Sequence, residues 1–497
     1  MNSQHQPLRG EPAAAPSLVA GYKLLPGVPD EMIDFAGNLR PGWDKLMAAF
    51  DALGTSELAE RFERADQYLR DAGVFYRTYD GAMGNERPWP LAHIPLIINE
   101  ADWETITNGL KQRAELLEKI VADIYGDNRL VEEGLLPPEL IAQNSEFLRP
   151  LVGVKPVSGH FLHFCAFELG RGPDGSWWVL GDRTQAPSGA GFALENRVAT
   201  TRALSDVNAG LNIHRLAAFF RDFRNTLFGQ AEKDGGRVGI LTPGQLNETY
   251  FEHAYIARYL GLMLLEGEDL VVENGKVMVR TVAGLMPVNV LWRRMDASFV
   301  DPLELRYDSH IGTPGMVEAL RSGSISMINA MGTGILETRA FAAFMPGLSK
   351  HLLGEALELP EMATWWCGQR AEREYVLDNF DSLMIGPAFA TTLPFDDLRG
   401  TALGASMTAE QKDVLKARIA SHGGDYVGQE SVRLSTTPVY VDGKLEPRPT
   451  TLRVYAARTT DGWTIMPGGL ARVGSARETT ALAMQHGGQA GDVWVLS

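Results

Sequence analysis

The segment from Trp177 to Arg197, WWVLGDRTQAPSGAGFALENR, holds the densest group of side chains that could do chemistry. Asp182 follows a strand-like run, and Glu195 and Asn196 follow a glycine-rich loop. Oxygen ligands of this kind suit Mg²⁺, which is commonly held by one or two carboxylates together with substrate phosphates. We therefore expect Asp182, Glu195 and Asn196 to converge on one metal ion. Spacing alone leaves a second interpretation open, in which Asp182 and Ser188 make turn hydrogen bonds and Glu195 caps or solvates a helix.

Arginines accompany these residues and indicate phosphate recognition. Arg183 and Arg197 lie in the same segment, and guanidinium groups bind phosphate oxygens bidentately. Arg453 lies inside a strand pattern, LRVYAAR, and Arg472 follows a Gly-Gly turn. A buried arginine in a strand requires a partner, whereas an arginine on an exposed strand face does not.

Two further segments could contact a ligand. Glu252 opens a predicted helix, at the end where acidic side chains are favoured, and Arg293 and Arg294 crowd a transition from strand to loop. These residues can bind a substrate or form a structural salt-bridge cluster. Gln429 and Glu430 belong to a strand-like segment, DYVGQESV, whose backbone edge could hydrogen-bond an adenine.

Composition excludes several functional classes. The chain has 497 residues and a formal net charge of -16, so we expect neither nucleic acid nor a membrane surface as a partner. The start has no signal-peptide pattern, and no run approaches the ~18 apolar residues of a spanning helix, which favours a cytoplasmic protein. Only Cys165 and Cys367 are present, too few for a disulfide framework or a cysteine-based zinc site. The patterns G-x-x-x-x-G-K-[ST], H-E-x-x-H, G-x-S-x-G and G-x-G-x-x-G after a strand are absent.

Hydrophobic periodicity predicts an α+β and α/β multidomain protein. Residues 1–20 form a loose tail, and residues 21–235 begin with helices from Asp44 and Asp102 and continue with a β-hairpin from about residue 160. Residues 236–375 begin with a β-α-β unit, which predicts parallel strands. Residues 376–497 consist of short strands, a helix around 411–419 and two hairpins.

Segments spread along the chain resemble one family. They are LLPGVPDEM, GDRTQAPSGAGFALENR, ILTPGQLNETYFEHAYIARYLG, LEGEDLVV, LWRRMDASFVDPLELR, INAMGTGILE, TWWCG, YVGQE, LRVYAA, MPGGLARV and DVWVLS. Together and in this order they resemble the circularly permuted ATP-grasp proteins, which are related to glutathionylspermidine synthetase-like ligases. The set covers nearly the whole chain and is far more specific than any single member.

The resemblance implies a fold and a reaction. It places the metal-binding half of the ATP-grasp core in residues 21–235, a Rossmann-like preATP-grasp domain in residues 236–375, and a small nucleotide-covering lobe with the return to the core in residues 376–497. The implied reaction is ATP-dependent and Mg²⁺-dependent carboxylate–amine ligation, in which an acyl phosphate forms and an amine displaces phosphate.

The resemblance also implies residue roles. Mg²⁺ is expected at Asp182, Glu195 and Asn196, and the nucleotide at Ser188, Gly189, Gln429 and Glu430. The arginines Arg183, Arg197, Arg453 and Arg472 are expected to neutralise phosphate charge, with Arg453 facing the phosphates. Glu252, Arg293 and Arg294 are expected to contact the acceptor.

One position departs from the family pattern. A lysine commonly ends the strand that we place at SLMIGPAF, and here that position is Gly386. We therefore expect weak binding of Mg²⁺-ATP, with Arg399 or Arg433 supplying the missing charge. A degenerate nucleotide-binding or scaffold protein without turnover is the alternative function. Relatives also suggest an α-E helical protein and a transglutaminase-like protein as partners.

Overall fold

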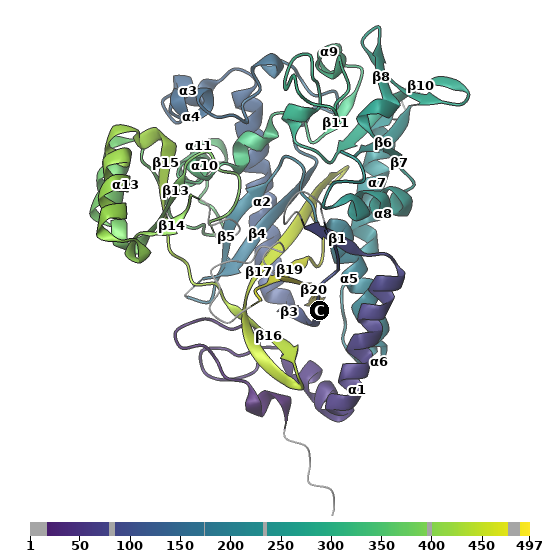
Figure 1. Ribbon diagram of the computed structural model, residues 1–497, viewed down its shortest axis with the longest axis vertical. Helices are drawn as coiled ribbons and strands as arrows, with labels where there is room; N and C mark the ends of the chain where they lie inside the picture. Colours follow the sequence, from purple (N-terminus) through teal and green to yellow (C-terminus); the bar gives the residue numbers. More distant parts are fainter. Residues whose placement is uncertain (1–16, 79–84, 173, 232–235, 395–399, 476–487) are drawn as a thin grey trace, which may run out of the picture.

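The largest layer of the fold is an eight-stranded sheet built from both ends of the chain (Figure 1). The computed structural model describes residues 17–78, 85–172, 174–231, 236–394, 400–475 and 488–497. The strand order is β3-β20-β19-β17-β4-β5, and β16 and β18 also pair with β17. The strands are β3 (Leu91–Asn99), β4 (Phe164–Arg171), β5 (Trp177–Arg183), β16 (Thr436–Val441), β17 (Lys444–Thr459), β18 (Gly462–Ile465), β19 (Leu470–Val473) and β20 (Gln489–Leu496).

An early strand and the last strand lie side by side in this sheet. β3 runs parallel to β20, with Ile97 opposite Trp494 and Ile98 opposite Val495. A sheet that joins the two ends of the chain agrees with a permuted order of elements. The sequence pattern predicts mostly helix in this front region and does not predict β3, because a short continuous apolar run does not distinguish a buried strand from a buried helix.

The predicted hairpins are confirmed. β4 pairs antiparallel with β5, and β17 pairs with both β16 and β18. Asp442 and Gly443 connect β16 to β17 with φ values of 47° and 80°. Positive φ at both central residues is what a tight two-residue hairpin turn needs, and a short polar residue followed by glycine adopts it at little cost.

Helices cover both faces of the eight-stranded sheet. α2 (Glu100–Ile124) crosses one face, and its Arg113 contacts Asp182 of β5. α7 (Ala217–Ala231) covers the other face, where Phe219 and Phe223 pack against Phe164 of β4. Successive side chains of a strand point to opposite faces, so Asp182 and its neighbour Arg183 have different surroundings.

The middle of the chain forms a second sheet in the order β7-β6-β10-β9-β8, with β11 on β10. Its strands are β6 (Arg237–Leu241), β7 (Met263–Leu265), β8 (Leu270–Glu273), β9 (Lys276–Thr281), β10 (Gly284–Arg293) and β11 (Ser326–Ile328). β6, β7, β10 and β11 are parallel, and α8 (Tyr250–Leu260) connects β6 to β7. The predicted β-α-β unit is thus confirmed, including the end of its helix at Gly261, where φ is 70°.

The third sheet is smaller and lies at the side of the molecule (Figure 1). Its four strands follow the order β12-β15-β13-β14, all antiparallel. They are β12 (Thr364–Trp366), β13 (Leu383–Pro387), β14 (Ala402–Leu403) and β15 (Tyr426–Glu430), accompanied by α12 (Arg370–Asp378) and α13 (Ala409–Ser421). This lobe has a hydrophobic core of its own, which includes Val376, Phe380 and Ile419. A separate core allows a lobe to move as a unit relative to the main body.

The remaining elements connect or flank these sheets. They are α1 (Trp43–Asp71), α3 (Arg129–Glu132), α4 (Pro138–Ala142), α5 (Ala190–Ala203), α6 (Ser205–Gly210), α9 (Met316–Arg321), α10 (Arg339–Ala342) and α11 (Met345–Leu352), with the hairpin of β1 (Phe75–Thr78) and β2 (Asn85–Pro88). Among the described residues, no helix combines the length and apolarity needed to cross a membrane. Most of the predicted N-terminal tail lies outside the described residues, and Leu18 is held by a hydrogen bond from its backbone N–H to Asp51.

Candidate functional site

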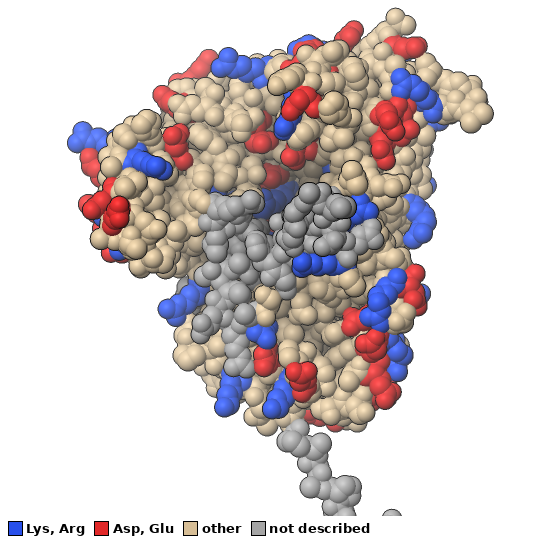
Figure 2. Space-filling view, in the orientation of Figure 1, with Lys and Arg blue, Asp and Glu red and all other residues tan. Residues whose placement is uncertain are grey.

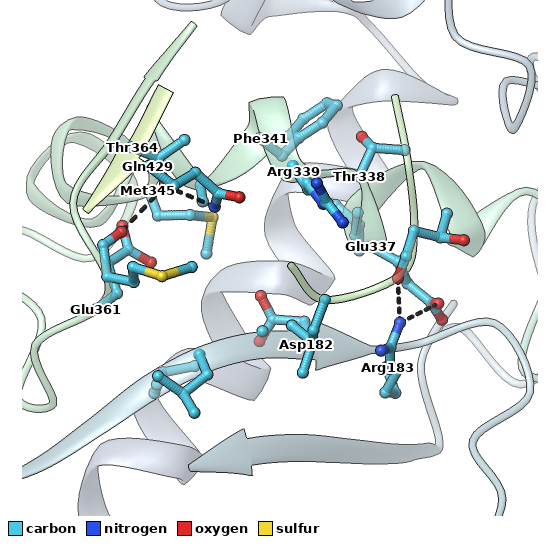
Figure 3. Close-up of a pocket in the computed structure, with 18 of the residues that line it drawn as sticks. Asp182, Arg183, Glu337, Thr338, Arg339, Phe341, Met345, Glu361, Thr364 and Gln429 are labelled. Atoms are coloured by element: carbon cyan, nitrogen blue, oxygen red, sulfur yellow. Dashed lines mark hydrogen bonds and ion pairs between the residues drawn. The ribbon is translucent and has the colours of Figure 1, made fainter. Parts of the chain in front are cut away.

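A cavity of about 40 Å³ lies between the free edge of the large sheet and the small sheet (Figure 3). β5 is the last strand of the large sheet, and the chain that leads into β12 runs along its edge, where Val179 donates to the carbonyl of Pro360 at 2.8 Å. Polar side chains from several elements line the cavity: Arg113, Asp182, Arg183, Glu337, Thr338, Arg339, Glu361, Thr364 and Gln429. This space holds a few water molecules at most.

Arg113 joins two carboxylates at the floor of this cavity. Its Nε and Nη2 donate to the two oxygens of Asp182 at 2.6 and 2.8 Å, and Nη2 also donates to Glu361 at 3.0 Å. All three side chains are at most 9% exposed. Burial raises the pKa of Glu361 to about 7, although Arg113 opposes the shift. Asp182 is therefore held by an ion pair on the face that α2 covers.

Arg183, the next residue of β5, lines the same cavity and lies within reach of Glu337. Its Nη1 is 3.7 Å from Glu337 and donates to the carbonyl oxygen of Thr391. Glu337 in turn accepts from the backbone N–H groups of Thr184 and Gln185 at 2.6 and 2.5 Å. Burial raises the pKa of Glu337, so its charge is costly in this position.

Arg339 is the third arginine of the cavity and begins α10. It is 6% exposed, and its Nε donates to the carbonyl oxygen of Thr392 at 2.8 Å. Its Nη1 donates to the hydroxyl of Thr401 at 2.7 Å. The carbonyl oxygens of two successive residues, Thr391 and Thr392, thus accept hydrogen bonds from Arg183 and Arg339.

Gln429 enters the cavity from β15, and Glu430 does not line it. The Gln429 amide donates to the hydroxyl of Thr364 on β12 at 3.1 Å, and Figure 3 shows both side chains above the cavity. Glu430 is the next residue along the strand and so points to the other face. The expectation of an open backbone edge here is wrong, because β15 lies between β12 and β13 and pairs with both.

The structure does not bring the three expected Mg²⁺ ligands together. Asp182 is paired with Arg113, while Glu195 accepts from the Tyr68 hydroxyl at 2.9 Å and Asn196 accepts from the Trp89 indole at 2.8 Å. The reason is topological, since α5 carries Glu195 and Asn196 and packs near β19 and β20, away from the α2 face where Asp182 lies. Across the described ranges, no group of three or more His, Cys, Asp or Glu side chains is arranged to hold a metal ion. These residues therefore do not fit a preformed Mg²⁺ site.

A second group of expected site residues does gather, around the glycine-rich loop that precedes α5. The Ser188 carbonyl accepts from Arg453 and from the Tyr455 hydroxyl at 2.9 and 3.1 Å. The Gly189 N–H donates to both oxygens of Glu252 at 2.8 Å. Glu252 is fully buried and supplies a negative charge to the N-terminus of α5, where carboxylates are stabilising. The loop is thus fixed by contacts within the protein.

Arg294 lies beside this loop with its guanidinium group unsatisfied. It is 6% exposed, and none of its three side-chain nitrogens has a hydrogen-bond partner among the described residues. The nearest charge is Glu252, whose Oε2 is 3.5 Å from Nη2. Arg294 follows the carboxyl end of β10, the end of a parallel strand at which α/β sheets bind ligands. A buried guanidinium that is paired with one carboxylate at 3.5 Å, and whose N–H groups make no hydrogen bond to the described residues, is suited to an anionic ligand.

The other expected arginines have structural contacts. Arg197 donates from Nε to the Asp492 carboxylate at 2.8 Å and anchors α5 to β20. Arg293 is buried, donates to the Gln185 carbonyl at 3.0 Å, and has its pKa lowered to about 10 by burial. Arg472 and Arg453 both contact Glu168, so a strand carboxylate partners these strand arginines. Arg433 is exposed and lies near Gly27, outside the cavity, and Arg399 lies outside the described residues.

Several cavity residues were missed by sequence reasoning. Arg113, Glu361 and Arg339 come from three different segments and make no recognisable spacing with Asp182. Only Glu337 had a sequence signal, because it ends the family-like segment INAMGTGILE as its single charged residue. Buried ionisable residues of this kind are recognised only once the fold brings them together.

The charged side chains on the visible face of the molecule are of both signs (Figure 2). Lys and Arg alternate with Asp and Glu over the described part of this face, without one broad region of a single charge.

Comparisons with known proteins agree with the resemblance. Residues 95–474 match the model of the family described as circularly permuted ATP-grasp type 2. An uncharacterised protein of Synechocystis sp. is 33% identical over 469 residues, which cover 94% of this chain and 96% of that protein. An uncharacterised protein of Mycobacterium tuberculosis is 35% identical over 454 residues, which cover 89% of this chain and only 50% of the relative. The chain thus spans about half the length of that relative.

A solved structure has the same fold. It is a glutathione synthetase-like effector from Globodera pallida in its apo form, with a TM-score of 0.58 and 12% sequence identity, covering 89% of this chain and 98% of the effector. The chain belongs to the circularly permuted ATP-grasp family.

Proposed function

We propose that this protein is an ATP-dependent ligase that joins a carboxylate to an amine. The carboxylate oxygen attacks the γ-phosphorus of ATP, the bond to the β,γ-bridging oxygen breaks, and ADP leaves. The amine nitrogen then attacks the acyl phosphate carbon, the bond from that carbon to the phosphate oxygen breaks, and phosphate leaves with a proton released from the amine. The observation that carries the proposal is the polar cavity between β5 and the small sheet in a chain of this family.

The cavity would have to open to admit a nucleotide. ATP is far larger than 40 Å³, so the small sheet and β5 must separate. Two features support such a movement. The small lobe has its own core, and the apolar cluster beside Leu180 of β5 is small, consisting of Leu180, Leu393 and Leu434. Lobe movements of this kind let an enzyme bind its substrate and then exclude water.

We assign the base and the phosphates of ATP to different parts of the cavity, according to the polar groups that line each part. Gln429 and Thr364 from the small sheet offer neutral amide and hydroxyl groups, which suit a base. Arg183 and Arg339 offer guanidinium groups, which suit phosphate oxygens. Since the described residues do not fit a preformed Mg²⁺ site, we propose that any Mg²⁺ arrives bound to the phosphates of ATP.

The second substrate is proposed to bind near the glycine-rich loop. Arg294 supplies a buried guanidinium without hydrogen bonds, and a substrate carboxylate would satisfy it. Arg294 and the Ser188–Gly189 loop lie on the side of the large sheet that faces the middle sheet. We therefore assign the middle sheet to the carboxylate or amine substrate and the small sheet to ATP.

Partner proteins belong to the proposal as well. The Mycobacterium tuberculosis relative is about twice as long as the matched region, so its additional half is a natural model for a separate partner of this chain. We propose that an α-E helical protein, a transglutaminase-like protein, or both act with it. The cytoplasmic location stays a prediction from the sequence.

The test is an ADP-release assay. The purified chain is incubated with Mg²⁺-ATP and with pooled amino acids, peptides or polyamines, and ADP and phosphate are measured together. The proposal expects release that depends on both a carboxylate and an amine. Binding of Mg²⁺-ATP without release in any pool, with or without the partner proteins, would favour the scaffold function.

A further inference from the structure

The place of the missing lysine is filled by another cation. We propose that Arg339, with Arg183 beside it, supplies the phosphate-binding charge that Gly386 cannot, an inference that rests on the proposed use of ATP. It replaces the expectation that Arg399 or Arg433 would do so.

The Arg339 guanidinium occupies the space that a side chain on Gly386 would enter. Gly386 lies in β13 opposite Val427 of β15, in ordinary strand pairing. A Cβ atom on Gly386 would lie 2.4 Å from Nη1 of Arg339 and 2.8 Å from the Thr401 hydroxyl. Both distances are shorter than real Cβ contacts, so a side chain at position 386 would require the Arg339 guanidinium and the Thr401 hydroxyl to move. The lysine expected at 386 and the arginine present at 339 would compete for one volume.

Two backbone hydrogen bonds fix the start of α10, which carries Arg339. Its backbone N–H donates to the Ala390 carbonyl at 3.1 Å, and the next N–H, of Ala340, donates to the Ala388 carbonyl at 2.9 Å. These bonds tie the start of α10 to the chain that leaves β13. The guanidinium therefore reaches the end of β13 from α10, whereas a lysine would have reached it from β13 itself.

Arg183 and Arg339 approach the same short segment. Their guanidinium groups donate to the carbonyl oxygens of Thr391 and Thr392, which are successive main-chain acceptors. Phosphate oxygens accept the same donors with stronger, charge-assisted hydrogen bonds. A nucleotide phosphate that enters the opened cavity can therefore take over donors that are already aligned. Planar guanidinium groups bind two oxygens each, which a lysine ammonium cannot do.

The cavity also contains carboxylates that oppose anion binding. Asp182 and Glu361 share Arg113, and Glu337 lies 3.7 Å from Arg183. Arg339 makes its described hydrogen bonds to Thr392 and Thr401, on the side of the cavity nearest the small sheet. Arg339 is also the arginine of this cavity whose Nη1 lies where a side chain of residue 386 would begin.

The geometry changes the expected effect of adding the lysine. Gly386→Lys alone would collide with Arg339 and should weaken ATP binding, which reverses the effect expected from the family pattern. The double variant Gly386→Lys with Arg339→Ala removes the collision and restores one cation. It should bind ATP more tightly than Gly386→Lys alone and more tightly than Arg339→Met.

The experiment measures the Kd of Mg²⁺-ATP and of adenosine for the full chain and four variants by calorimetry. Arg339→Met should weaken ATP binding by about 10- to 150-fold, the range for one charge-assisted hydrogen bond, and leave adenosine binding unchanged. The double variant should recover most of the loss. Arg370→Ala serves as the control, because this arginine is 85% exposed on α12.

The outcomes separate the two claims. If the wild-type chain binds no ATP, the proposed function and this inference both fail. If the wild-type chain binds ATP and Arg339→Met binds it equally well, the inference fails while the proposed function stands. A parallel loss of adenosine affinity would indicate a structural role and would also overturn it. Where Arg339→Met does not fold, the double variant decides: recovery of ATP binding relative to Gly386→Lys supports the inference, and no recovery contradicts it.

Discussion

Asp182 is bound by both of its carboxylate oxygens to the Arg113 guanidinium, at 2.6 and 2.8 Å, inside the protein. The sequence pattern indicated Asp182 as a Mg²⁺ ligand, but its carboxylate is paired with an arginine. Its carboxylate instead offsets the charge of an arginine on α2, and Glu361 shares that arginine.

Asp182→Asn should therefore destabilise the fold whether or not Mg²⁺ is present. It leaves Arg113 with one carboxylate in a buried site, and breaking a buried ion pair costs about 3–5 kcal/mol. Urea unfolding with and without Mg²⁺ measures the loss. Asp308→Asn breaks an exposed pair with Arg306 and should change stability by less than about 1 kcal/mol. A loss that appears only with Mg²⁺ would favour the metal-ligand interpretation.

Glu361 should make stability depend on pH. Its pKa is about 7 in the folded chain against 4.5 for an ordinary glutamate, so between these values the folded state holds more protons than the unfolded state. The free energy of unfolding should then fall as pH rises from 4.5 to 7, by roughly 3 kcal/mol relative to Glu361→Gln. Unfolding of both proteins across this range measures the difference. Glu358→Gln, at an exposed site nearby, should follow the wild type, and parallel curves for the wild type and Glu361→Gln would contradict the prediction.

Arg294→Ala should raise the KM of the substrate other than ATP. A carboxylate that binds this guanidinium loses a charge-assisted hydrogen bond, which corresponds to about a 10- to 150-fold effect. The KM for ATP should stay the same, because ATP is assigned to the cavity between β5 and the small sheet, which Arg294 does not line. Arg258→Ala on the exposed side of α8 is the matched control. An equal rise in both KM values would show that Arg294 stabilises the fold rather than a substrate.

Leu393→Ala should loosen the contact between the small lobe and β5. Leu393 is 6% exposed, packs with Leu180 and Leu434, and lines the cavity together with Leu180. If binding requires opening, a larger open population tightens the apparent Kd for ATP. Hydrogen exchange of β5 and calorimetry with ATP measure the two effects. Faster exchange combined with weaker ATP binding would contradict the proposed opening.

The sequence predicted elements whose pattern is local. Alternating residues and turn dipeptides indicated the hairpins of β4 with β5 and of β17 with its neighbours, and an apolar strand followed by an amphipathic helix indicated β6 and α8. β3 could not be predicted in the same way, because its continuous apolar run gains a strand partner only from β20 at the other end of the chain. Long-range pairing of this kind leaves no local signal.

The site was less predictable than the fold. Glu195 and Asn196 follow Asp182 closely in sequence, but the hydrogen bonds to Tyr68 and Trp89 turn them toward α1 and the start of β3. Conversely, Arg113 and Arg339 are far from Asp182 in sequence and line the same cavity. The sequence shows that Gly386 stands where the family pattern has a lysine. Only the structure shows that the Arg339 guanidinium lies in the space beside it.

The most direct measurement is photolabelling with 8-azido-ATP in the presence of Mg²⁺, followed by mass spectrometry of the labelled peptides. The base is assigned to the lining from β12 and β15, so the label should fall on peptides that contain Thr364 or Gln429, and excess ATP should prevent it. Label on the middle sheet around Arg294, or no label that ATP displaces, would contradict the placement of ATP between β5 and the small sheet.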